Sequence, residues 1–231
     1  CGQEGDSWPA GAQDDSFHGL SRGGKKEGKP GADGCAIRLT TQERQFLNHI
    51  WTHPTLTVTQ RYSSLGLSSR GGTGVQKSLQ TKRLVVPLSI SIGRGRTKIL
   101  SLTDRGKAIL GITEPDADRL GGPEHMYWKR RLTDHLRGNG CEVVEEFAVG
   151  GGKTIDLVAT KGGKRIAFEV ETGKSDAAGN VEKCLEAGFQ RVVVVATSTA
   201  ALHALAQIVP VRHHVSLLTG AEAVQHNSWQ S

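Results

Sequence analysis

The chain has 231 residues, of which 36% are hydrophobic and 5% aromatic, and it carries a net charge of +6 at pH 7. It contains no run of about 18 apolar residues, which excludes a membrane-spanning helix, and no apolar segment behind a basic N-terminus that resembles a secretory signal. We therefore expect a soluble, cytoplasmic protein without membrane partners, long enough for one large or two small domains.

The charge is unevenly distributed along the chain. Residues 1–36 carry four basic and six acidic side chains, residues 37–112 carry twelve and two, and residues 113–231 carry thirteen and fifteen. A basic block between two mildly acidic ones is typical of a module that binds a polyanion, and nucleic acid is the commonest such partner. A solvated basic surface with no partner is the alternative.

The first 36 residues are rich in Gly, Asp, Ser and Lys, and Trp8, Phe17 and Leu20 are almost their only large apolar side chains. Such a segment buries too little apolar surface to offset the entropy lost on ordering. We therefore predict a disordered N-terminal tail over residues 1–36.

A helical pattern begins after this tail, with capping threonines at 40 and 41 and a stop before Pro54. Gly93 and Gly95 then indicate a turn between two strands, and Gly111 ends the last helix. The elements expected over 37–112 are helices at 41–53, 58–65 and 68–82, strands at 84–92 and 98–102, and a helix at 104–110.

This order, three helices followed by a basic hairpin and a closing helix, is that of a winged helix. The segment LSLTDRGKAIL, residues 100–110, resembles the part that follows the wing in MarR-like winged-helix proteins. The resemblance implies that the third helix enters a DNA major groove while the hairpin approaches phosphates or the minor groove. The implied DNA-binding residues are Arg70, Lys77, Lys82, Arg83, Arg94 and Arg96. A winged helix that makes only protein contacts is the alternative.

A linker rich in Gly and Pro is expected over residues 113–123, and a second pattern follows it. The elements expected there are a helix at 124–137, strands at 141–149, 153–160 and 165–172, a helix at 177–187, a strand at 192–196, a helix at 200–208, a strand at 215–218 and a short helix from 221. Glycines between the first three strands predict an antiparallel meander. The apolar run Val192 to Ala196 predicts a strand that is buried on both faces.

Three carboxylates stand out on the strands of the meander. Glu169 and Glu171 are two residues apart, so they share one face of their strand, and Asp156 on the neighbouring strand joins them if the strands pair in register. Clustered like charges are costly unless a cation or a proton offsets them, which favours a hard divalent ion such as Mg²⁺ or Mn²⁺. Such an ion supports phosphodiester hydrolysis.

The helix, the meander and the segments IDLVA (155–159) and IAFEVE (166–171) together resemble the PD-(D/E)xK, or restriction-endonuclease-like, nuclease superfamily. The resemblance implies a mixed-sheet α/β core of the order αβββαβ over residues 124–231. It also implies metal binding by Asp156 and Glu169, with Glu124 as a further acidic ligand from the first helix, as in some branches of the superfamily.

One position departs from the superfamily pattern, because Glu171 stands where a catalytic lysine is usual. Lys174, at the end of the same strand, and Lys183, on the next helix, are the candidates to replace it. Lys174 is preferred here, and Lys183 is interpreted as an exposed helix charge that pairs with Glu186.

The expected function is therefore a Mg²⁺-dependent or Mn²⁺-dependent DNA endonuclease, targeted by its winged helix and acting in a mobile element or a defence system. A homodimer or the ATPase of a mobile element is the expected protein partner. The alternatives are a nuclease-like DNA-binding or adaptor protein that has lost cleavage, and a transcription regulator.

Overall fold

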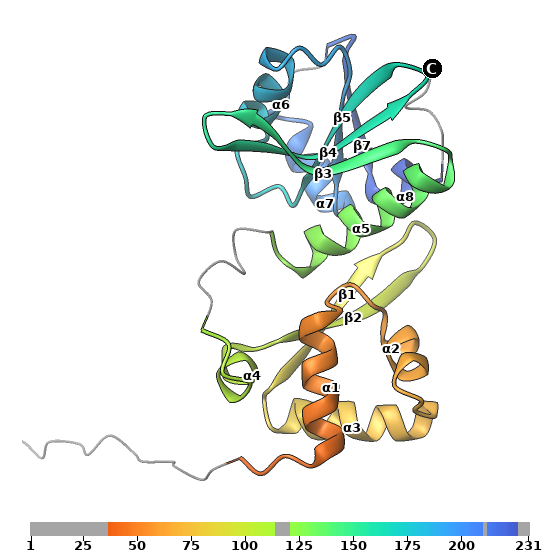
Figure 1. The fold of residues 1–231 in the computed structure, drawn as a ribbon, viewed down its shortest axis with the longest axis vertical. Helices are drawn as coiled ribbons and strands as arrows, with labels where there is room; N and C mark the ends of the chain where they lie inside the picture. Colours follow the sequence, from red (N-terminus) through yellow and green to blue (C-terminus); the bar gives the residue numbers. More distant parts are fainter. Residues whose placement is uncertain (1–36, 114–120, 210–211, 226–231) are drawn as a thin grey trace, which may run out of the picture. The chain divides into compact units, whose positions relative to one another are not determined.

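The structure, a computed structural model, describes residues 37–113, 121–209 and 212–225. We call residues 37–113 the N-terminal region and residues 121–225 the sheet region (Figure 1). The sheet region contains a five-stranded mixed sheet with helices, which confirms the mixed α/β class. The predicted tail at 1–36 and most of the predicted linker lie outside the described residues.

The N-terminal region contains three helices, an antiparallel hairpin and a fourth helix, in that order. Its elements are α1 (Thr41–Thr52), α2 (Val58–Ser64), α3 (Ser69–Thr81), β1 (Val85–Ser91), β2 (Arg96–Leu102) and α4 (Asp104–Ile109). Capping boxes begin α1 and α2: the side chains of Thr40 and Thr57 accept from the backbone N–H of Glu43 and Gln60, whose side chains accept in return. These local signals explain why both helices begin where the sequence predicts.

A buried arginine ties α2 to the end of α1. The side chain of Arg61 has no exposed surface, and its guanidinium donates to the carbonyl oxygens of His49 and His53 at 2.5 and 2.7 Å. These carbonyls belong to the last turn of α1 and its cap, where helix carbonyls lack intrahelical partners. Burial lowers the pKa of Arg61 to about 10, so the side chain remains a cation at neutral pH.

A second buried charge, Glu43, connects α1 to α3. Lys82 lies 2.6 Å from Glu43 Oε1, Ser78 Oγ donates to the same oxygen at 2.7 Å, and the backbone N–H of Thr40 donates to Oε2 at 2.8 Å. Burial alone would raise the pKa of Glu43, but these hydrogen bonds outweigh it and lower the pKa to about 2. Glu43 is therefore ionised and fully hydrogen-bonded inside the fold.

Gly72 explains why a glycine-rich segment forms α3. A Cβ atom at this position would lie 2.4 Å from the ring of Tyr62, so only glycine lets α2 and α3 approach this closely. Val75 and Leu79 bury the same face of α3. Packing between helices thus compensates for the low helix propensity of the glycines.

The sheet region follows the predicted order αβββαβαβα. Its elements are α5 (Pro123–Gly138), β3 (Glu142–Gly150), β4 (Lys153–Lys161), β5 (Lys164–Glu171), α6 (Ala177–Glu186), β6 (Val192–Ala196), α7 (Thr199–Leu205), β7 (Val215–Thr219) and α8 (Gly220–Ala223). The strands lie in sequential order, with β3, β4 and β5 antiparallel and β5, β6 and β7 parallel. The predicted meander and the fully buried strand at 192–196 are both confirmed.

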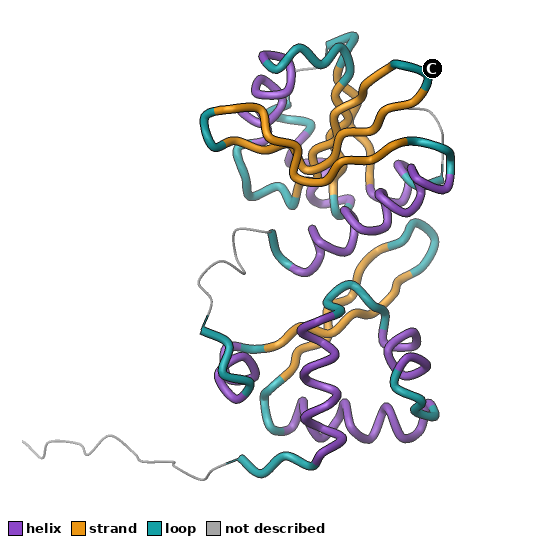
Figure 2. The backbone as a smooth tube through the Cα atoms, in the orientation of Figure 1, coloured by secondary structure: helices purple, strands orange, loops and turns teal. Residues whose placement is uncertain are grey.

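Helices cover both faces of the sheet (Figure 2). Trp128, Leu132 and Leu136 of α5 pack with α8 against one face, while Val181 of α6 and Leu205 of α7 pack against the other. Trp128 also donates its indole N–H to the carbonyl of Thr197 at 2.9 Å, which anchors α5 near the end of β6. The N-terminal end of α5 is thereby held near the ends of the central strands.

The sheet is distorted where β3, β4 and β5 carry their acidic side chains. Glu146 has a left-handed backbone, with φ of 50°, and the regular pairing of β4 with β5 ends at Leu157 opposite Phe168. Beyond that point, the backbone N–H of Val170 donates to the carboxylate of Asp156 at 2.8 Å, in place of a strand carbonyl. The side chain of Asp156 is therefore inserted where the strands separate.

Candidate active site

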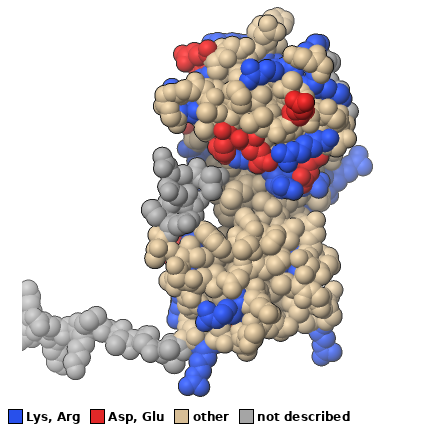
Figure 3. All heavy atoms as spheres, in the orientation of Figure 1, with Lys and Arg blue, Asp and Glu red and all other residues tan. Residues whose placement is uncertain are grey.

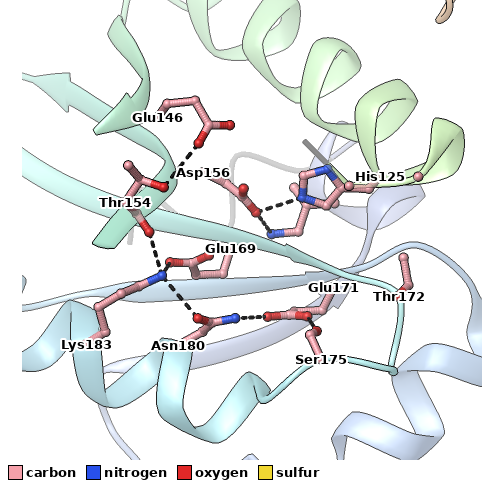
Figure 4. Close-up of a pocket in the computed structure, with 13 residues that line it drawn as sticks. His125, Glu146, Thr154, Asp156, Glu169, Glu171, Thr172, Ser175, Asn180 and Lys183 are labelled. Atoms are coloured by element: carbon pink, nitrogen blue, oxygen red, sulfur yellow. Dashed lines mark hydrogen bonds and ion pairs between the residues drawn. The ribbon is translucent and has the colours of Figure 1, made fainter. Parts of the chain in front are cut away.

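A cavity of about 320 Å³ lies where β4 and β5 separate, beside the first residues of α5 and α6 (Figure 4). Asp156 of β4 lines it together with Glu169 and Glu171 of β5, so the structure brings together the three carboxylates singled out in the sequence. Both glutamates have only 3% of their surface exposed. All three acids therefore border the same cavity.

Asp156 is held by two hydrogen bonds to the same oxygen. Its Oδ2 contacts Nε2 of His125 at 3.0 Å and accepts from the backbone N–H of Val170. Burial raises the pKa of Asp156, but the hydrogen bond and the charge of His125 outweigh burial, so its pKa is lowered. Asp156 is therefore an ionised carboxylate whose orientation is set by α5 and β5.

His125 is a site residue that the sequence did not reveal. Burial alone would lower its pKa, but the hydrogen bond and charge of Asp156 raise it, so a shared proton stabilises the pair. The Nδ1 atom of His125 is buried and has no hydrogen-bond partner among the described residues. The only sequence signal was its place beside Glu124 in the first turn of α5.

Glu169 differs from Asp156 in its protonation. Its Oε1 lies 2.9 Å from Nζ of Lys183 and accepts a weak hydrogen bond from Cys184 Sγ at 3.4 Å. Burial and the negative charge of Asp156 raise the pKa of Glu169 to about 7, even with Lys183 beside it. Two neighbouring carboxylates with oppositely shifted pKa values are typical of functional sites.

Lys183 corrects one expectation from the sequence. We interpreted it as an exposed helix charge, but its side chain is only 10% exposed and points from α6 into the cavity. Its Nζ donates to the carbonyl of Thr154 at 2.6 Å and to Oδ1 of Asn180 at 3.1 Å. Lys183 is thus the cation that accompanies Glu169, whereas Lys174 is exposed and does not line the cavity.

Glu171, two residues after Glu169 on β5, has both carboxylate oxygens engaged. Asn180 donates to its Oε1 at 2.8 Å, and the hydroxyl of Ser175 donates to Oε2. These contacts join the end of β5 to the start of α6. Glu171 therefore helps to place the helix that carries Lys183.

Glu124, the further acidic ligand suggested by the family resemblance, does not line the cavity. Burial raises its pKa, and the charge of Lys174 partly offsets that rise, so these two residues act on each other. The residue that α5 directs to Asp156 is instead His125.

The donor set suits a magnesium ion better than zinc or calcium. Among the described residues, no group of three or more His, Cys, Asp or Glu side chains is arranged to hold a metal. Mg²⁺ needs only one or two carboxylates, because it retains several waters. Asp156 Oδ1 and Glu169 Oε2 accept no hydrogen bond within the described ranges, so both remain available as oxygen ligands.

The predicted DNA-binding residues fall into two groups by exposure. Arg70 and Lys77 lie two turns apart on the exposed side of α3, and Arg94 and Arg96 are exposed at the hairpin between β1 and β2. Arg83 is also exposed, but Lys82 is ion-paired with buried Glu43. In the view of Figure 3, Lys and Arg side chains project from the end of this region that holds α1 and α3. Lys82 thus differs from the other predicted residues in having a carboxylate partner within the fold.

No protein-family model matches the chain, and no curated protein matches it in sequence. Within the described residues, none of the helices combines the length and the apolar character needed to cross a membrane. Any functional conclusion therefore depends on the geometry of the site.

Proposed function

We propose that this chain is a metal-dependent DNA endonuclease with a restriction-endonuclease-like domain over residues 124–231. One observation carries the proposal: Asp156, Glu169 and Lys183 meet around an open cavity where two central strands separate. Two carboxylates that can hold a metal ion, with a cation beside them, support metal-assisted phosphodiester hydrolysis. In this proposal Lys183, from α6, supplies the cation that the sequence lacks at position 171.

The proposal assigns DNA recognition to residues 37–112, as a winged helix. Three helices, an antiparallel hairpin and a short fourth helix support this assignment. Arg70 and Lys77 on α3 are placed for contacts to the DNA groove, and Arg94 and Arg96 on the hairpin for contacts to phosphates. Phosphate contacts of this kind contribute affinity irrespective of base sequence.

The proposed metal ligands are Asp156 and Glu169. A bound Mg²⁺ or Mn²⁺ would supply positive charge beside the scissile phosphate and lower the pKa of a coordinated water. With a raised pKa of about 7, Glu169 is partly protonated at neutral pH, and a nearby cation favours its ionised form. The two carboxylates thus fit a divalent ion both in charge and in the oxygens that they offer.

The chain's own residues perform the remaining tasks. His125 and the backbone N–H of Val170 fix the orientation of Asp156. Lys183 holds its ammonium charge at the cavity beside Glu169, where that charge would stabilise a phosphate oxygen. Asn180 holds Lys183 and Glu171 together, so it positions the lysine.

A pair of lysine variants tests the proposal. We expect Lys183→Met to reduce cleavage of DNA by about a hundredfold, since it removes the cation from the cavity. Lys174→Met removes the same charge from an exposed position outside the cavity and should cleave as the wild type does. Cleavage is measured on supercoiled, linear, single-stranded and branched DNA with Mg²⁺, Mn²⁺ or EDTA.

The second candidate function is a nuclease-like DNA-binding protein that does not cleave. The observation in its favour is Glu171, whose oxygens are both engaged by Asn180 and Ser175 at the position of the usual lysine. Salt-dependent DNA binding by the wild type, with no cleavage of any substrate in either metal, would establish this candidate and contradict the first.

A further inference from the structure

A second, larger cavity lies at the other end of β5 from the carboxylates. Its volume is about 940 Å³, and its lining comes from the start of β5, the loop between α6 and β6, and the segment before β7. The cationic and titratable side chains that line it are Lys164, Arg165, Arg191, His213 and His214. No Asp or Glu belongs to the described lining, in contrast to the cavity around Asp156. We call this cavity the basic groove.

Arg165 is held in the basic groove by two aromatic rings. Its guanidinium carbon lies 4.9 Å from the ring centre of Phe147 and 4.7 Å from that of Phe189. The two rings meet edge to face, with centres 5.9 Å apart. Contact with both rings restrains the guanidinium, yet Arg165 remains exposed to solvent. A planar cation is therefore held at the groove.

Positive charge is concentrated where the hairpin of β4 and β5 turns. Lys161 and Lys164 are directly opposite each other across the two strands, an arrangement that repulsion between like charges disfavours. Lys161 donates to the carbonyl of Asn139 at 2.7 Å. Nearby Arg212 is paired with Glu182 at 3.0 Å, outside the groove lining. An anion in the groove would relieve the repulsion between the two lysines.

A planar guanidinium and several cations match the two parts of a nucleotide. Bases of single-stranded nucleic acid stack on aromatic side chains and on arginine planes, while phosphates contact lysines and arginines. Arg165 also lies on the same face of β5 as Glu169, four residues away, which corresponds to about 13 Å along the strand. A nucleic acid strand in the groove would thus lie near the carboxylates of the proposed active site.

We propose that the basic groove binds a segment of single-stranded nucleic acid, with a base stacked on Arg165 and a phosphate at Lys164. The inference rests on the proposed function for the identity of its ligand, because it gives the DNA a contact outside the cleavage cavity. The geometry of the groove itself does not depend on Asp156 or Lys183.

Binding of a fluorescein-labelled octathymidylate to the full chain in EDTA tests this proposal without cleavage. We expect Arg165→Lys, which keeps the charge but loses the planar stacking surface, to weaken binding about tenfold. Lys164→Gln should weaken it about threefold. The matched control is Arg131→Gln, which removes an exposed cation from α5 on the other face of the sheet and should bind as the wild type does.

Several outcomes would overturn the proposal. Octathymidylate binding that is unchanged in both Arg165→Lys and Lys164→Gln would place the strand elsewhere on the chain. Thymidine monophosphate that binds as tightly as the octamer would indicate a site for a free nucleotide, and equal competition by inorganic phosphate would indicate an anion site without base recognition. Because the cation–π contacts with both rings are made by Arg165, the Lys164 variant remains informative if Arg165→Lys alters the fold.

Octathymidylate binding in EDTA, combined with the cleavage assay in Mg²⁺ or Mn²⁺, separates this inference from the proposed function. Asp156→Asn should retain octathymidylate binding while it loses cleavage. A wild type that does not cleave, but whose octamer binding depends on Arg165, would support the groove and contradict the endonuclease. A wild type that cleaves, with octamer binding insensitive to Arg165 and Lys164, would support the endonuclease and overturn the groove.

Discussion

The N-terminal region and the sheet region each bury a small group of charged side chains, but their carboxylates differ in how fully they are hydrogen-bonded. In the N-terminal region, both oxygens of Glu43 accept hydrogen bonds, and its pKa is lowered to about 2. In the sheet region, Asp156 and Glu169 each keep one oxygen without a donor in the described ranges, and the pKa of Glu169 is raised to about 7.

This difference distinguishes buried charge that connects helices from buried charge at the proposed active site. Glu43 and Arg61 connect helices, and their hydrogen bonds are made within the fold, although Nε of Arg61 is buried without a partner among the described residues. Asp156 and Glu169 repel each other beside an open cavity, which is stable only because His125 and Lys183 offset part of their charge. Carboxylate oxygens without donors next to a cavity are the reason why the second group is proposed as the active site.

The largest effect is expected at Asp156. We expect Asp156→Asn to reduce the cleavage rate about a thousandfold, or about 4 kcal/mol in activation free energy, because it removes a proposed metal ligand. DNA binding and the unfolding midpoint should change little. The measurement is single-turnover cleavage with Mg²⁺ at saturating protein. An activity within threefold of the wild type would contradict the assignment of Asp156.

A substitution at Arg61 should change the free energy of unfolding by a similar amount, about 4 kcal/mol, and should leave the cleavage rate of the folded protein unchanged. We expect Arg61→Met to lower the free energy of unfolding by about 4 kcal/mol, since several helix-end carbonyls lose their donor inside the N-terminal region. Urea unfolding followed by circular dichroism measures this change. The matched control is Arg105→Met, an exposed arginine on α4 that should change the free energy by less than 0.5 kcal/mol, an order-of-magnitude bound for surface sites. Equal effects of the two variants would remove the structural role of Arg61.

The pH dependence of stability should show opposite slopes for the two glutamates. Glu43 has a lowered pKa, so its contribution is present above its ordinary value of 4.5 and is lost as the pH falls toward 2. Glu169 has a raised pKa, so its contribution is present below 4.5 and is lost as the pH rises toward 7. Between these pH values the free energy of unfolding should fall by up to about 3 kcal/mol because of Glu169.

Two glutamine variants check these slopes. Glu169→Gln should flatten the pH dependence of unfolding between 4.5 and 7, a window in which Glu43→Gln should leave the slope unchanged. Glu43→Gln should instead flatten the pH dependence of unfolding between about pH 2 and 4.5. Urea unfolding at half-unit pH steps gives both slopes, and an unchanged slope in Glu169→Gln would argue against strained burial of that carboxyl group.

The smallest effects are expected for the exposed cations of α3. We expect Lys77→Gln to weaken duplex DNA binding a few-fold and to reduce the salt dependence by about one counterion, with no loss of stability. Lys82→Gln should mainly lower stability, by about 1 kcal/mol, because Lys82 is paired with Glu43. Fluorescence anisotropy at several salt concentrations, with urea unfolding in parallel, distinguishes the two variants. Identical behaviour would remove the distinction drawn between these lysines.

Much of the architecture could be predicted from the sequence. The capping threonines at 40 and 41 predicted where α1 begins, and the run from Val192 to Ala196 predicted a fully buried strand. The convergence of Asp156 with Glu169 followed from the meander, because neighbouring antiparallel strands place these residues close together. Each of these signals lies within one element or one hairpin.

The partners of the site residues could not be predicted in the same way. Lys183 borders the apolar face of α6, so its spacing fits an exposed charge as well as a buried one, and contact with β4 and β5 makes it part of the site. His125 has no motif that marks it, and its role depends on how α5 is anchored by Trp128. Arg61 was likewise one of twelve basic residues in a charged block.

Taken together, the amino-acid pattern specified which segments form helices and strands, and which acids share a part of the sheet. The choice between Lys174 and Lys183, the pairing of His125 with Asp156 and the protonation of Glu169 depended on how α5 and α6 pack on the sheet. The physical reason is the distance along the chain over which each kind of interaction acts. Capping and periodicity act over one turn or one strand, whereas the solvation and electrostatic partners of a charge come from residues distant in sequence.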